Sequence, residues 1–146
     1  MNVKKALKEK AKLIKKIGES FSRIEAYNSV EEGTIRPYDP RVSLAQWLAD
    51  VDKLIVLKAE IHKANTKVLD KIFRLSELKN IIKQIKSIDC SEGKSFSGYG
   101  RSEASIKNSL ISVVERDELV KKYETEIEDL QEILDAHNLK TLVKVV

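Results

Sequence analysis

The chain has 146 residues, of which 42% are hydrophobic, 34% are charged and only 5% are aromatic, and its formal net charge is +4. This length fits one domain, the hydrophobic content excludes a disordered chain, and five glycines with two prolines exclude a collagen-like one. A single cysteine, Cys90, excludes an internal disulfide framework and fits a reducing compartment.

A seven-residue repeat predicts a first helix over residues 2–28. Leu7, Ile14 and Phe21 recur at this spacing. The companion positions of the repeat are held by Val3, Lys10, Ile17 and Ile24. A strict repeat of seven residues is typical of a narrow contact between long helices.

Two prolines, Pro37 and Pro40, fix the backbone and predict a first loop over residues 29–42. Ser43 is followed three residues later by glutamine, which matches a capping box and predicts a second helix over residues 43–66. Its apolar positions are Leu44, Trp47, Leu48, Val51, Leu54, Ile55 and Ile61.

The middle of the chain is less periodic. Residues 67–74 fit either a short strand or a continued helix, and Ser76 as a cap predicts a third helix over 76–88. Its apolar face consists of Leu78, Ile81, Ile82, Ile85 and Ile88. A second loop is predicted over 89–103, and a short β-rich stretch over 106–114.

Heptad spacing returns in the last predicted helix, residues 115–137, which we expect Asn138 to cap. The apolar positions of this helix are Val120, Tyr123, Ile127, Leu130 and Leu134. The tail after it alternates loosely between polar and apolar residues and predicts an edge strand.

The two ends of the chain carry complementary charges. Residues 1–16 hold seven lysines and one glutamate, whereas residues 115–135 hold nine carboxylates against three basic residues. We expect such helices to lie side by side, within one chain or between subunits. Narrow apolar seams bury little surface in one chain, so the sequence predicts a homo-oligomer. The predicted fold is a single, mainly α domain over residues 1–146: a long-helix hairpin or coiled-coil bundle with a small β element, closed by oligomerisation.

Several short motifs resemble the septicolysin-like family of uncharacterised bacterial proteins. They are ALKEKAKLIKKI at 6–17, YDP at 38–40, IHKANT at 61–66, LSEL at 75–78 and IEDLQEILDAHN at 127–138. The resemblance implies a helical hairpin with a small β element and implies no established function. The pore-forming activity that the family name suggests is not carried over, because this sequence lacks a signal segment and an apolar span.

Motifs for catalysis are absent from the sequence. It contains no H-x-x-x-H or C-x-x-C spacing for a metal and no glycine-rich phosphate loop, so we expect a non-enzyme without a metal or cofactor. The first ten residues lack the apolar run of a secretory signal, and no stretch approaches the roughly 20 apolar residues of a membrane span. We therefore expect a cytoplasmic protein with no membrane partner.

Two irregular segments combine cations with aromatic rings. Arginine binds phosphate with two donors, and a tyrosine ring stacks on a base. The candidate ligand-binding residues are Arg36, Tyr38 and Arg41 in GTIRPYDPR, and Lys94, Tyr99 and Arg101 in GKSFSGYGR. The structural alternative is that Arg41 pairs with an acidic residue and that Tyr38 packs under the hairpin.

The leading hypothesis is an oligomeric helical protein that binds and sequesters a small anionic, nucleotide-like ligand. Small phage proteins that sequester nucleotide immune signals have the same general character, by analogy of type only. The alternative is a coiled-coil module that binds another protein. A third hypothesis is weak binding of nucleic acid by the lysine-rich first helix, which we do not favour because no aromatic residue or arginine is interleaved with the lysines.

Overall fold

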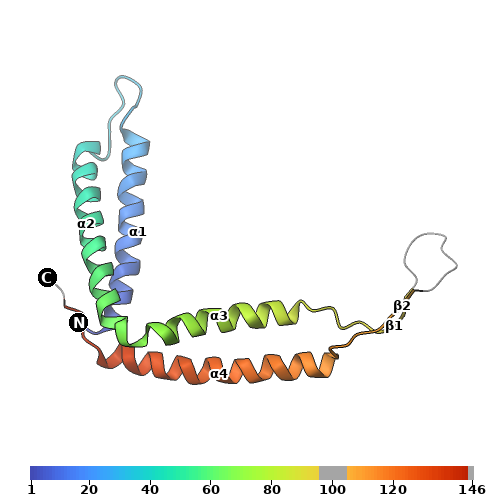
Figure 1. The fold of residues 1–146 in the computed structure, drawn as a ribbon. Coiled ribbons are helices and arrows are strands. Elements are labelled where there is room, and N and C mark those ends of the chain that lie inside the picture. Colours follow the sequence, from blue (N-terminus) through green and yellow to red (C-terminus); the bar gives the residue numbers. More distant parts are fainter. Residues whose placement is uncertain (96–104, 145–146) are drawn as a thin grey trace, which may run out of the picture. The chain divides into compact units, whose positions relative to one another are not determined.

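The computed structural model describes residues 1–95 and 105–144 (Figure 1). Within these residues the fold is mainly helical with one two-stranded antiparallel sheet, which confirms the predicted fold class at this level. The elements in chain order are α1 (Val3–Tyr27), α2 (Pro40–Asn65), the 3-10 turn η1 (Thr66–Val68), α3 (Leu69–Lys86), β1 (Gly93–Ser95), β2 (Ser105–Lys107) and α4 (Val113–Lys140).

The chain divides into two compact units. The first unit comprises residues 1–68 with 135–146, and the second comprises residues 69–134. Helix α4 contributes to both units, so a single domain over residues 1–146 stays a prediction.

In the first unit, α1 and α2 form an antiparallel hairpin along a narrow seam (Figure 1). Most of the buried and half-buried residues of both helices recur at alternating spacings of three and four. They are Val3, Ala6, Lys10, Leu13, Ile17, Ser20, Ile24 and Tyr27 on α1, and Ser43, Trp47, Asp50, Leu54, Leu57, Ile61 and Ala64 on α2.

The predicted companion line of α1 therefore lies on this seam, whereas the line of Leu7, Ile14 and Phe21 lies beside it. These three side chains are 39%, 48% and 42% exposed. The second line on this seam is that of Ala6, Leu13 and Ser20, each one residue before Leu7, Ile14 or Phe21, so the repeat alone does not distinguish the line that faces α2. On α2, Leu44 and Val51 likewise flank the seam.

The N-terminus and the C-terminal tail after α4 pack together at the end of the hairpin opposite the loop that joins α1 to α2. Val143 is buried in a core with Val3, Ala6 and Ile61. An antiparallel bridge joins Asn2 to Leu142, and Val3 N donates a 3.0 Å hydrogen bond to Thr141 O. The predicted edge strand is thus present as an isolated bridge.

In the second unit, α3 and α4 are connected by ion pairs. Arg74 donates from Nε and Nη2 to the two carboxylate oxygens of Glu126, at 2.8 and 3.1 Å. Lys86 Nζ lies 3.6 Å from Glu124 Oε1. The apolar residues predicted for these helices are buried or half-buried, except Ile88, which is 36% exposed. Ile88 lies outside α3, because this helix ends at Lys86 and not at the predicted residue 88.

A small antiparallel hairpin of β1 and β2 follows α3. Lys94 pairs with Ile106, and Gly93 pairs with Lys107. Gly93 has a φ of 100°, a backbone conformation that L side chains rarely adopt, so glycine suits the start of β1. Strand β2 ends at Lys107, and the predicted β-rich stretch over 106–114 is therefore wrong beyond that residue.

Helices α2 and α3 begin earlier than the sequence indicates. Helix α2 starts at Pro40 rather than Ser43, because the Asp39 side chain caps it by accepting a 2.8 Å hydrogen bond from Arg41 N. Helix α3 starts at Leu69 rather than Ser76, since η1 leads directly from α2 into α3. Residues 69–74 are therefore helix.

The ends of α4 also differ from those predicted. Ser112 Oγ accepts a 3.1 Å hydrogen bond from Glu115 N, a capping contact that starts α4 at Val113. The helix continues past the predicted cap at Asn138 and ends at Lys140.

Candidate functional site

Arg36 is held against the C-terminal end of α1. Its Nε donates to Tyr27 O at 2.6 Å, and its Nη2 donates to Asn28 O at 3.2 Å. Carbonyls at this end of a helix lack intrahelical partners and carry partial negative charge, and the last turn of α1 contains no basic residue. The predicted ligand-binding residue Arg36 therefore also has a structural role in closing α1.

Tyr38 contacts two residues of α1. Arg23 Cζ lies 4.1 Å from the centroid of the Tyr38 ring, and the Tyr27 ring centroid lies 5.9 Å from it. Tyr38 remains 43% exposed. Sequence reasoning missed Arg23, although its spacing of four from Tyr27 places both residues on one face of the helix.

The structure brings the three predicted residues of the first loop together. Arg36, Tyr38 and Arg41 line one open cavity of about 550 Å³, whose other lining residues are Asn28, Asp39 and Pro40. Two guanidinium groups beside an aromatic ring are suited to an anionic, planar ligand. The Asp39 carboxylate in the same wall opposes a second negative charge close to it.

None of the residues predicted from the second loop is assigned to this cavity. Lys94 is an exposed residue of β1 in the second unit. Tyr99 and Arg101 lie outside the residues that the structure describes. The cavity is therefore built from the first loop and the helix ends beside it.

One side of the α1–α2 hairpin is charged. Asp50 is only 1% exposed, with Lys16 Nζ 2.9 Å from its Oδ2 and Lys53 Nζ 3.4 Å from its Oδ1. Burial raises the pKa of the Asp50 carboxyl, but hydrogen bonds from Lys16 and Gln46 and the Lys16 charge outweigh burial, so its pKa lies below the ordinary value. The ion pair between Lys16 of α1 and the buried Asp50 of α2 therefore connects the two helices across the seam.

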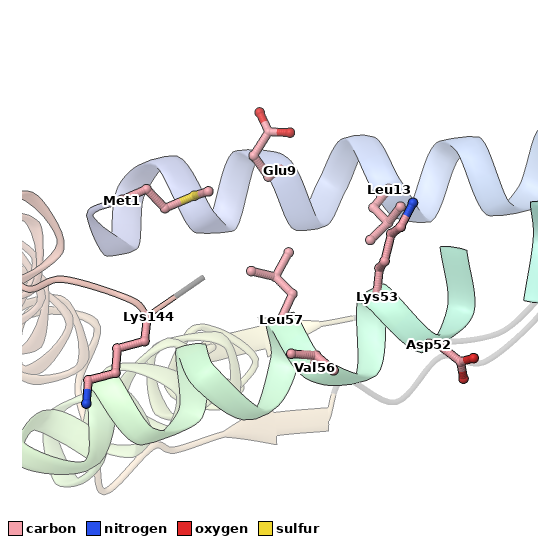
Figure 2. A pocket seen from close by; sticks show the side chains of 8 residues that line it. All are labelled: Met1, Glu9, Leu13, Asp52, Lys53, Val56, Leu57 and Lys144. Carbon is pink, nitrogen blue, oxygen red and sulfur yellow. The ribbon is translucent and has the colours of Figure 1, made fainter. Parts of the chain in front are cut away.

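A hollow of about 500 Å³ lies along the hairpin near both chain ends (Figure 2). Leu13, Val56, Leu57 and Met1 supply its apolar lining. The remaining lining residues, Glu9, Asp52, Lys53 and Lys144, carry two negative and two positive charges, so the hollow offers no net charge to a ligand.

The opposite side of the same hairpin is apolar. Residues Lys16 and Lys53, with Glu9 and Lys12, line one cavity and therefore share a side, which we call the charged side. On this side the charged residues come one residue before a seam residue: Lys16 precedes Ile17, and Lys53 precedes Leu54. Because one residue is a rotation of about 100° around the helix, the residues that come one after a seam residue lie on the opposite side of the hairpin. The apolar side consists of Leu7, Ile14, Phe21, Leu44, Leu48, Val51 and Ile55.

The apolar side is well exposed in the chain as described. Leu44 is 45% exposed, Leu48 50% and Ile55 59%. The Phe21 ring contacts Trp47 on α2 with centroids 5.4 Å apart, which extends the apolar surface across both helices. Large exposed apolar surfaces mark sites of protein or membrane interaction, or ligand-binding grooves.

No metal centre emerges from residues 1–95 and 105–144. Within these ranges no group of three or more His, Cys, Asp or Glu residues could hold a metal ion. The pKa of Asp89 is lowered to about 2 by hydrogen bonds from the side chain and backbone of Ser91 and by Lys107, which is a local arrangement at the entry to β1. Over the described part of the chain, no helix has the length and apolar character needed to cross a membrane.

Comparison with known proteins gives no match. No protein-family model, no curated protein and no solved structure is similar to this chain.

Proposed function

We propose that the chain is a non-enzymatic interaction module whose apolar side binds a helical protein surface. The observation that supports this most strongly is the placement of seven apolar side chains on one side of a two-helix hairpin, opposite a charged side. Burying such a surface contributes about 25 cal/mol per Å² of apolar area. A partner that covers the apolar side would therefore gain more free energy from burial than one that covers another side of this hairpin.

The residues of α2 support the same proposal. Helix α2 carries apolar residues on both its seam and its outer side. The apolar residues of α2 therefore extend beyond the face that α1 covers.

Replacing Leu48 with Asp tests this proposal without naming the partner. If the unmodified chain is assembled, the variant should lose most of its assembly; if it is monomeric, a hydrophobic dye should bind to it, and binding should fall several-fold in the variant. Ile106→Asp is the matched control, because Ile106 is 64% exposed on β2 in the other unit. An assembly that Leu48→Asp leaves intact would contradict the proposal, as would a monomer that binds no dye.

A second candidate function is binding of a small anionic, nucleotide-like ligand at the hairpin tip. The observation that favours it is the cavity shared by Arg36, Tyr38 and Arg41. Two of the donors of Arg36 already bind backbone carbonyls, so Arg41 is the guanidinium that we expect to bind most of the phosphate.

Thermal melting with a panel of nucleotides tests the second candidate. A ligand at 100 times its Kd should raise the free energy of unfolding by about 2.7 kcal/mol. Arg41→Ala should weaken binding at least tenfold with the melting temperature unchanged, whereas Arg36→Ala should also destabilise the hairpin by about 1 kcal/mol. If no nucleotide shifts the melting temperature, the tip is structural.

The resemblance to the septicolysin-like family stays a prediction. Nucleic-acid binding by α1 receives no support from the tip, because the arginines there contact carbonyls and a tyrosine ring rather than extending the row of lysines.

A further inference from the structure

The apolar side continues along α1 as a second seam. Leu7, Ala11, Ile14, Gly18 and Phe21 follow one another at spacings of four, three, four and three. This is the same pattern that the first seam uses against α2. All five residues are exposed in the chain as described.

Gly18 has no explanation within the chain itself. Glycine destabilises a helix interior relative to alanine, and a Cβ added at Gly18 would meet nothing within 4 Å. Glycine is expected where another backbone approaches closely. Its position between Ile14 and Phe21 on the second seam places that approach on the apolar side.

The two helices of the hairpin place their apolar residues at matching levels. The Lys16–Asp50 ion pair and the Phe21–Trp47 ring contact set position 14 of α1 level with about positions 52 to 54 of α2. Leu48 and Ile55 are centred on this level of α2, and Leu7 and Phe21 are centred on Ile14. These five residues are therefore nearly symmetric about one point, whereas Leu44 lies beyond them.

We infer that a second copy of this chain covers the apolar side. The two copies are related by a two-fold axis that lies between them, passes beside Ile14 and is perpendicular to the helices. This inference rests on the proposed function. An isologous contact needs a surface that is complementary to itself. The axis pairs Leu7 with Phe21 of the second copy, Ala11 with Gly18 of the second copy, and Leu48 with Ile55 of the second copy.

Charge and exposure agree with this arrangement. The same axis brings the exposed Lys4 at one end of the second seam to Glu25 of the second copy at the other. The side chains that this contact would cover have surface available, since Leu7, Leu48 and Ile55 are 39%, 50% and 59% exposed.

Cross-linking at single cysteines in a Cys90→Ser background tests the axis. Ile14→Cys should give a covalent dimer with bismaleimidoethane in high yield, because two residues beside the axis face each other. Leu7→Cys is the matched control: its two copies would lie about 21 Å apart along the helices, beyond the reach of the reagent. Gly18→Leu should reduce the dimer at least tenfold while the helical content stays unchanged, since the chain itself leaves room for the side chain.

The outcomes separate this inference from the proposed function. An assembly that Leu48→Asp dissociates, but in which Ile14→Cys does not cross-link, would overturn the two-fold axis and leave the apolar side as the contact surface. A monomer that binds hydrophobic dye would overturn the second copy as partner. An assembly that Leu48→Asp leaves intact would overturn both.

Discussion

Replacing Val143 with Asp should lower the free energy of unfolding of the first unit by about 2–4 kcal/mol. Val143 is 3% exposed and packs with Val3, Ala6 and Ile61, so the new carboxylate would enter an apolar core without a partner. Thermal or urea unfolding of the full chain, followed by circular dichroism, measures the loss.

The neighbouring residue supplies the control for this change. Leu142 is 74% exposed, because successive side chains of an extended segment point to opposite sides. Leu142→Asp should change the free energy of unfolding by less than about 0.5 kcal/mol. Equal effects of the two substitutions would show that the tail does not close the hairpin core.

Removing Lys16 should also destabilise the hairpin, by about 1–3 kcal/mol. Lys16→Ala takes away the closest partner of the buried Asp50 carboxylate and leaves Lys53 at 3.4 Å. Asp50→Leu should cost less than about 1 kcal/mol or even stabilise the seam, because an apolar residue of similar volume replaces a buried charge. Urea unfolding of both variants and of the double variant measures the coupling between the two residues.

The pH dependence of unfolding gives this pair a second test. The pKa of Asp50 is lower in the folded chain than in the unfolded one, so its contribution to stability is complete above the unfolded pKa and is lost as the pH falls through the folded value. The loss is therefore expected below about pH 4. In Asp50→Leu this part of the acid dependence should disappear; an unchanged profile would mean that the Asp50 pair does not stabilise the seam.

Sequence periodicity predicted the four long helices, because each carries apolar residues at helical spacing. It did not predict which of two adjacent apolar lines of α1 faces α2. Val3 is buried and Ile17 and Ile24 are half-buried on the seam, whereas Ile14 and its neighbours at the same heptad position stay exposed. The choice depends on the partner helix, in particular on where Asp50 places its charge in the seam.

The errors at helix ends have local causes. The Ser112-Val-Val-Glu115 segment matches a capping box, and this signal was available in the sequence for the start of α4. Ser43 matched the same pattern, yet Asp39 before Pro40 starts α2 three residues earlier. An aspartate followed by proline is the stronger start signal here, since the proline needs no hydrogen bond to its nitrogen at the first helical position.

The candidate ligand site was predictable in composition but not in the roles of its residues. Proximity of Arg36, Tyr38 and Arg41 follows from their closeness in sequence, and the shared cavity agrees with it. The use of Arg36 to close α1 depends on how the chain folds back after Asn28, which residue types alone do not reveal.

Sedimentation equilibrium of the unmodified chain at micromolar concentration tests most directly whether a second copy covers the apolar side. We predict a mass of about twice 16.6 kDa for the unmodified chain and 16.6 kDa for Leu48→Asp measured in parallel. A mass of 16.6 kDa for the unmodified chain throughout the micromolar range would contradict the second copy as partner.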